Sequence, residues 1–162
     1  MPLEIERKYK LDKFPENLPE LTRAAVEQGY LCTRPTVRIR SKRTAEGTTY
    51  ELCFKGEGKL AREEIEMPLT AEQFEQLRSL VKGPLIRKDY RVYALPDGKK
   101  LECSLVDEGE ATSFLYAEVE FPSIAEAEAF TAPDCVGEDI TGKPGVSMGS
   151  YWRRTRGGKQ GE

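Results

Sequence analysis

Residues 3–11 read LEIERKYKL and open with a strict alternation of apolar and charged side chains. Successive side chains of a β-strand point to opposite faces, so Leu3 and Ile5 share the apolar face. The opposite face carries Glu4, Glu6 and Lys8. The stretch therefore predicts a strand with two carboxylates and one amine in a row.

Five further segments repeat this alternation, with charges of both signs on one face of each. Turn-forming residues separate them, as in the Pro96-Asp97-Gly98 sequence, and indicate antiparallel hairpins. A shorter strand is expected at 101–105. The five segments are 35–43, 49–55, 61–69, 85–95 and 114–121.

Three helices are expected, two between these strands and one after the last of them. Helical spacing of Leu18, Leu21 and Ala25 predicts a helix over 15–29 that ends at Gly29. A second helix is predicted over 70–81, where Thr70 and Gln73 resemble a capping box. The third is predicted from Ser123 to about Phe130.

The composition fits one compact domain over residues 1–162, with 38% hydrophobic and 33% charged residues. The formal net charge of -3 gives no reason to expect nucleic acid or an acidic membrane surface as a partner. The chain has no histidine, which excludes catalysis and metal binding through imidazole. The tail from about residue 157 is expected to be disordered.

No two of the four cysteines are spaced as CxxC, so they are expected to be buried free thiols rather than a zinc site. The N-terminus lacks a signal-peptide core, and no apolar run approaches the length of a membrane span. A cytoplasmic, reduced protein is therefore expected. The cysteines are Cys32, Cys53, Cys103 and Cys135.

The charged strand faces have two interpretations. A single strand of this kind ordinarily turns its charged side to water. Like charges two residues apart on several strands, however, need opposite charges between them. Strands that curl into a barrel would enclose the charged faces, and helices would cover the apolar outside. The fold class is then α+β, an antiparallel β-barrel of about eight strands.

Such a lumen would suit a phosphate chain together with a divalent cation. Guanidinium groups match phosphate oxygens, and crowded carboxylates require a hard cation such as Mg²⁺ or Mn²⁺. The expected basic residues are Arg38, Arg40, Lys42, Lys55, Arg62, Arg87 and Arg91. The expected acidic residues are Glu4, Glu6, Glu64, Glu66, Glu118 and Glu120.

The EIERKY run, with its Glu-x-Glu-x-Lys motif, resembles the signature of the CYTH family, the triphosphate tunnel metalloenzymes. The resemblance continues in order through VRIR, the lysine before a glycine turn, the paired glutamates after Arg62, and AEVEF. It departs at IRKDYRVY, where an ungapped match selects Lys88 and Tyr90 while periodicity selects Arg87 and Arg91. After the LPDG turn, Glu102 and Ser104 stand where the family tends to have an aspartate.

The resemblance implies an eight-stranded antiparallel tunnel and a divalent-metal-dependent triphosphatase, with inorganic triphosphate as the expected substrate. Glu118 and Glu120 would hold the catalytic metal, with Glu64 or Glu66, while Glu4 and Glu6 would hold a second metal or position water. Lys8 would reach the phosphate nearest the nucleophile. The other expected phosphate contacts are Arg38, Arg40, Lys55, Arg62, Arg87, Arg91 and Lys143.

Several alternatives stay open from the sequence alone. Thiamine or nucleoside triphosphate would fit the same motifs, and so would cyclisation of ATP to cyclic AMP, as in class IV adenylate cyclases. A non-catalytic binder of polyphosphate is a further alternative, although both glutamate pairs are intact. Tyr151, Trp152 and the arginines after them would either close one tunnel mouth or form a surface segment. A homodimer is neither indicated nor excluded.

Overall fold

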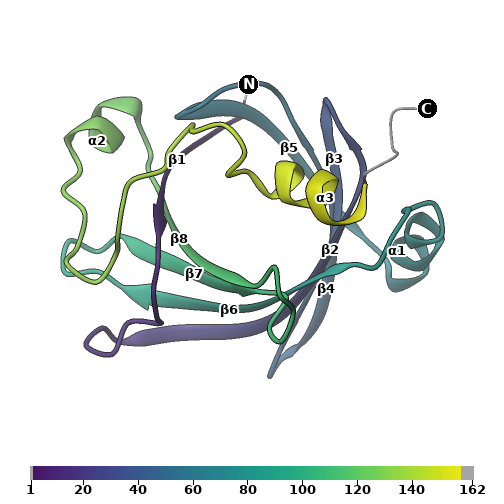
Figure 1. The fold of residues 1–162 in the computed structure, drawn as a ribbon, viewed down its shortest axis with the longest axis horizontal. Helices are drawn as coiled ribbons and strands as arrows, with labels where there is room; N and C mark the ends of the chain where they lie inside the picture. Colours follow the sequence, from purple (N-terminus) through teal and green to yellow (C-terminus); the bar gives the residue numbers. More distant parts are fainter. Residues whose placement is uncertain (1, 158–162) are drawn as a thin grey trace.

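The computed structural model describes residues 2–157 as a closed barrel of eight antiparallel strands, with three helices in this part of the chain (Figure 1). Around the barrel the strand order is β1-β5-β4-β3-β2-β6-β7-β8. The strands are β1 (Leu3–Lys10), β2 (Glu20–Thr33), β3 (Thr36–Thr44), β4 (Gly47–Lys55), β5 (Ala61–Leu69), β6 (Ile86–Ala94), β7 (Lys100–Val106) and β8 (Phe114–Glu120). The helices are α1 (Ala71–Arg78), α2 (Ile124–Ala129) and α3 (Met148–Arg156). The expected α+β barrel is confirmed.

Strand register places the charged faces inside the barrel. Residues paired across neighbouring antiparallel strands point to the same face. Glu6 pairs with Glu120 across β1 and β8, and Lys55 pairs with Glu64 across β4 and β5. All four of these side chains line the internal cavity. The charged faces of the predicted strands therefore do not form the outer surface of the barrel, except on β6.

The apolar faces pack on the outside of the wall. Ile39 and Phe74 anchor one cluster, in which α1 covers β3, β4 and β5. A second cluster surrounds Tyr9 and Val119, beneath α2 and the segment that follows it. As expected, much of the hydrophobic core lies between the barrel wall and its covering elements.

A third apolar cluster fills one end of the barrel. Trp152 and Tyr151 of α3 pack against Tyr30, Ile86 and other side chains that continue the inward faces of their strands. Trp152 is fully buried, and its ring centroid lies 5.7 Å from that of Tyr30. Figure 1 shows α3 in yellow at one side of the ring of strands. This helix, which the sequence pattern did not predict, therefore closes one end.

The predicted helix over 15–29 is wrong, because residues 20–33 form β2. Alanine, glutamate and glutamine favour a helix locally, but pairing with β3 on one side and β6 on the other outweighs that preference. Gly29 is no helix stop. A Cβ atom there would lie 2.6 Å from Leu85, so the glycine permits close packing on the wall.

The other two helix predictions are confirmed. Thr70 caps α1, and its capping box with Gln73 is complete in both directions. Ser123 caps α2. The chain from Gly157 onward was expected to be disordered; Gly157 ends α3, and residues 158–162 lie outside the described part of the chain.

The cysteine prediction is half right. All four are free thiols; Cys53 and Cys103 are buried, whereas Cys32 and Cys135 are exposed. The last two lie near the end of β2 and in the segment after α2, outside the packed wall. Among the described helices, none has the length and apolar character needed to cross a membrane.

Asp107 ties α3 to the barrel and gives a stability prediction. It is 1% exposed, accepts from Tyr151 at 2.6 Å, pairs with Arg156 at 2.8 Å, and has a φ of 47°. Asp107→Asn tolerates that backbone but removes the charge opposite Arg156. We expect a loss of about 2 kcal/mol in the free energy of unfolding, measured by urea denaturation.

The control is Asp134→Asn, because Asp134 is exposed in the segment after α2. It should change the free energy of unfolding by less than about 0.5 kcal/mol. Equal stability of Asp107→Asn and the parent protein would show that this ion pair does not hold α3 in place.

Candidate active site

The barrel holds a cavity of about 260 Å³ whose lining residues are mostly polar or charged. All eight strands contribute to it, together with the loop 58–60 and the segment 141–149. Twelve of the fourteen expected site residues line it. They are Glu4, Glu6, Lys8, Arg38, Arg40, Lys55, Arg62, Glu64, Glu66, Glu118, Glu120 and Lys143. Lys42, expected in the lumen, lines it as well.

Arg87 and Arg91 were expected inside the tunnel, and this prediction is wrong. Arg87 is exposed and lies 3.7 Å from Glu110, and Arg91 pairs with Asp89 and lies over the ring of Phe14. Apolar residues of β6 occur on both faces, because Ile86 and Val92 point inward with the tunnel lining while Tyr93 packs outside. Periodicity therefore chose the wrong face.

Lys88 and Tyr90, which the motif match selected, line the cavity instead. Lys88 is 8% exposed and donates to the hydroxyl of Tyr116 at 2.5 Å. Burial lowers the pKa of Lys88 well below its usual value. A buried amine with only a phenol as hydrogen-bond partner is well placed to meet an anion.

Glu4 lies at the centre of a buried ion-pair cluster. Both of its oxygens accept from Lys55 at 3.0 Å, and Arg62 lies 3.4 Å away. Although burial alone would raise its pKa, these cations lower the pKa of Glu4 to about 2. Burial and the neighbouring Glu4 raise the pKa of Glu64 to about 8.

Glu6, Glu118 and Glu120 crowd together where β1 pairs with β8. Burial and the carboxylate of Glu118 raise the pKa of Glu6 well above its ordinary value. Burial also acts on Glu118, but Lys8 and a hydrogen bond from Glu6 lower its pKa. Desolvation, with Glu102 and Glu4 nearby, raises the pKa of Glu120 to about 7. This crowding favours protons or a cation between the carboxylates.

Three of these carboxylates can converge on one ion. Ligand oxygens of Glu4, Glu6 and Glu120 lie within 4.8 Å of one another. Mg²⁺ and Mn²⁺ prefer carboxylate oxygens, so the residues present fit such a cation.

Glu102 supplies an acid after the LPDG turn. Glu102 lines the cavity beside Glu118, with which it is paired across β7 and β8. The hydroxyl of Tyr90 donates a hydrogen bond to Glu102. Burial raises its pKa. Strand alternation in 101–105 already placed Glu102 and Ser104 on one face, and both line the cavity.

Arg38 and Arg40 form a guanidinium pair on β3. Both bind Glu51, at 2.9 Å and 2.6 Å, while the Nε atoms of both are buried without a partner. Arg38 is only 7% exposed. Buried donors without partners are costly, which favours an anion in the cavity. Glu51 separates the two charges, but sequence reasoning did not identify its role.

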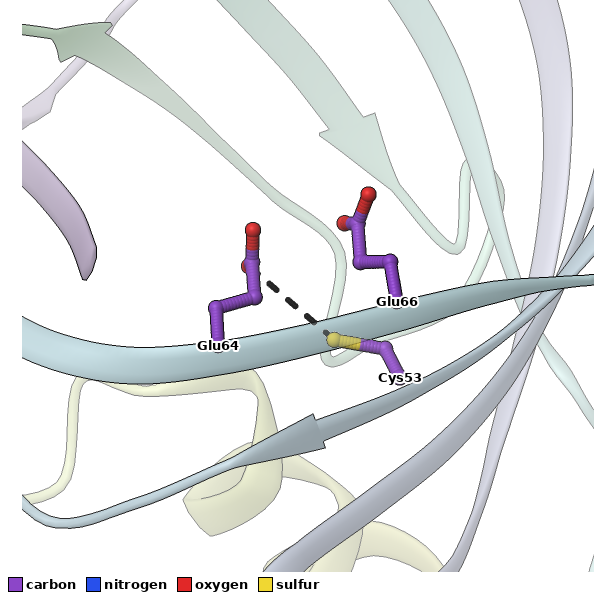
Figure 2. Close-up of side chains that lie close together, drawn as sticks. All are labelled: Cys53, Glu64 and Glu66. Carbon is purple, nitrogen blue, oxygen red and sulfur yellow. Dashed lines mark hydrogen bonds between the residues drawn. The ribbon is translucent and has the colours of Figure 1, made fainter. Parts of the chain in front are cut away.

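Figure 2 shows Cys53 of β4 beside Glu64 and Glu66 of β5, with its thiol donating to Glu64 at 3.9 Å. One ligand atom of each lies within 4.8 Å of the others. Burial raises the pKa of the Cys53 thiol to about 11, so it is protonated at neutral pH. The thiol thus adds no negative charge to this wall.

Lys143 lines the cavity from a loop, but its amine pairs with Glu138 rather than with a residue of the barrel interior. Its side chain is half exposed. The contacts of Lys143 therefore hold its amine less firmly toward the barrel interior than the contacts of the other expected phosphate-binding residues in the cavity.

The raised carboxylate pKa values predict how stability depends on pH without metal. Glu64 and Glu120 keep a proton up to about pH 8 and 7 in the folded protein, against 4.5 when unfolded. The unfolded chain binds fewer protons in this window, so the free energy of unfolding should fall from about pH 5 to pH 8. Glu4, with a pKa of about 2, contributes a constant amount there.

Urea denaturation of the chelator-treated protein at several pH values measures this slope. Added Mg²⁺ should offset the fall, because it binds the ionised carboxylates of the folded state. A stability that rises across the window would contradict the protonation of Glu64 and Glu120.

Comparisons with known proteins agree with this geometry. The chain is 38% identical over 138 residues to an inorganic triphosphatase of Nitrosomonas europaea, covering 85% of this chain and 89% of that protein. The crystal structure of the inorganic triphosphatase NE1496 matches with a TM-score of 0.63 and 30% identity, over 93% of this chain and 95% of that one.

A more distant match shares the fold alone. It is a putative adenylyl cyclase from Hippeastrum, whose structure is described as revealing a dominant triphosphatase activity. The TM-score is 0.55 at 15% identity, over 80% of this chain and 83% of that one. No family model matches the chain. On the strength of the Nitrosomonas relative and the tunnel itself, the chain belongs to the family of short, CYTH-type triphosphatases.

Proposed function

We propose that the protein hydrolyses the terminal phosphate of inorganic triphosphate with the help of Mg²⁺ or Mn²⁺. One observation carries the proposal: the same cavity holds buried guanidinium donors without partners and crowded carboxylates that favour a cation. A metal-bound phosphate chain satisfies both needs at once. The similarity to the inorganic triphosphatase of Nitrosomonas europaea supports inorganic triphosphate as the substrate.

The positively charged side chains that line the cavity, here called the cationic wall, would bind the phosphate chain. Arg38 and Arg40 present their guanidinium groups from β3, and Lys88 faces the cavity from β6. Lys8 donates to the carbonyl of Val146 at 3.0 Å and lies over the ring of Tyr116, which holds its amine in the tunnel. These fixed charges would spread the negative charge that develops on the phosphate oxygens.

Glu4, Glu6 and Glu120 would hold the divalent cation, with Glu118 close by. When bound, such an ion would supply positive charge that neutralises the phosphate oxygens. Glu4 is already engaged by Lys55 and Arg62. Once Glu6 has lost its proton in the presence of the cation, its carboxylate would be better placed to accept a hydrogen bond from the attacking water. No imidazole is required.

The test is a substrate panel of inorganic triphosphate, ATP and thiamine triphosphate, each with Mg²⁺, Mn²⁺ or chelator. We expect phosphate and pyrophosphate chiefly from inorganic triphosphate, and none with chelator. Cyclic AMP with pyrophosphate from ATP would indicate a cyclase instead. Tight binding of triphosphate without turnover would indicate a binding protein and would contradict the proposal.

A further inference from the structure

Arg7 lies on β1 between two tunnel residues but points to the opposite, outer face. Its Nε donates to an oxygen of Asp139 at 3.0 Å, and a second nitrogen binds the same oxygen. The remaining nitrogen donates to the carbonyl of Ala127 in α2 at 2.7 Å. The guanidinium group thus joins three separate segments, and its side chain is 20% exposed.

Asp139 links Arg7 to the tunnel wall through hydrogen bonds. Its other oxygen accepts from the backbone and the hydroxyl of Thr141, at 2.9 Å and 2.6 Å. The Thr141 hydroxyl in turn accepts from the backbone N–H of Lys8 at 2.9 Å. A continuous chain of hydrogen bonds therefore runs from the outer guanidinium to a residue that lines the cavity.

The segment 137–147 completes the wall where the barrel is weakest. β1 pairs with β5 only from Leu3 to Ile5. Farther along β1, the backbone of this segment replaces β5: Gly137 donates to Lys10 at 2.8 Å, and Ile140 donates to Lys8 at 2.8 Å. A single β-bridge joins Tyr9 to Asp139 between them.

The same segment carries part of the cavity lining. Thr141, Gly142, Lys143 and Val146 all face the tunnel, and the Val146 carbonyl accepts from the amine of Lys8. A shift of the segment would therefore move both the wall and the lysine. Backbone hydrogen bonds, the Thr141 hydroxyl and a Lys10–Glu138 ion pair also join the segment to β1, and the Arg7–Asp139 pair anchors it on the outer face of the barrel.

We propose that Arg7 is a positioning residue: from outside the barrel it fixes the segment 137–147, and through it the place of Lys8 and the tunnel wall. The effect on turnover rests on the proposed triphosphatase function. The effect on the segment itself does not.

The experiment compares Arg7→Ala, Arg7→Lys and Asp139→Ala with the double variant Arg7→Ala/Asp139→Ala. Amide hydrogen exchange should speed up at least about tenfold in 137–147 in each variant, with little change in β3, β4 and β7. kcat/KM for inorganic triphosphate should fall about 10- to 100-fold in Arg7→Ala. The double variant should lose no more than the worse single one, because both remove one contact.

The matched control is Arg23→Ala, which removes an outward guanidinium of β2 whose partner, Glu20, lies on the same strand. It should change neither exchange in 137–147 nor kcat/KM. Arg7→Lys should recover part of kcat/KM, since it keeps the charge but loses the two-nitrogen geometry.

Unchanged exchange in 137–147, or exchange that speeds up equally throughout the barrel, would overturn the proposal. So would additive losses in the double variant. If the parent protein fails to hydrolyse triphosphate, the proposed function is wrong, and the exchange measurement still decides whether Arg7 fixes the segment.

Discussion

Replacing Glu120 with glutamine is expected to lower kcat for inorganic triphosphate by about 10²- to 10³-fold while the protein stays folded. Glu120 offers an oxygen to the same point as Glu4 and Glu6, and glutamine removes its charge with almost no change of shape. Electrostatic contributions of this kind to a transition state are typically of that size. Triphosphate binding should survive, because the cationic wall is untouched.

Stability separates this effect from a folding defect. Burial, with repulsion from Glu102 and Glu4, raises the pKa of Glu120 to about 7. Without metal, the glutamine variant should therefore be at least as stable as the parent protein above that pH. Glu63→Gln, on the exposed outer face of β5, is the control and should keep full activity. Full activity of Glu120→Gln would remove this carboxylate from the metal site.

Arg40→Ala is expected to weaken triphosphate binding by about 2 to 5 kcal/mol, the usual cost of removing one partner of a desolvated charge pair. Its Nε is buried without a partner, so the free protein does not use all of its donors. Glu51 keeps Arg38 at 2.9 Å, and the barrel should therefore fold normally. Calorimetry with inorganic triphosphate in chelator measures the affinity directly.

Two further variants test how Arg40 contributes to triphosphate binding. Arg40→Lys keeps the charge but not the fork, and an intermediate affinity would show that guanidinium geometry contributes. Arg43→Ala removes an exposed arginine from the same strand, outside the tunnel, and should leave the affinity unchanged. An unchanged affinity in Arg40→Ala would place the phosphate chain elsewhere in the cavity.

Much of the fold follows from period-two alternation, because one face of most strands is charged and the other apolar. The rule failed where the faces are less distinct. β2 carries alanine and glutamine on its inward face, as in Ala24 and Gln28, so its apolar residues follow no clear strand pattern. α3 went unpredicted because its aromatic residues fill a barrel end that exists only after the strands have closed.

Residue types and motif order predicted most of the cavity lining, but not its internal pairing. The error on β6 came from counting apolar residues, since Ile86 faces inward near the apolar end of the same tunnel that holds Lys88. Lys42 lies over the ring of Tyr90, and that hydroxyl binds Glu102. Such contacts join strands that are distant in sequence, so the composition of the chain does not predict them.

The pairing of β1 with β8 brings the first strand of the chain against the last. Hairpins such as β3–β4 and β6–β7 close short loops, whereas this pairing requires nearly the whole chain to be ordered, so we expect it to form late in folding. Glu6 meets Glu120, and Lys8 meets Glu118, only across it. A ligand that bridges these strands recognises the finished protein alone, and its binding energy adds to native stability without rewarding partly folded intermediates.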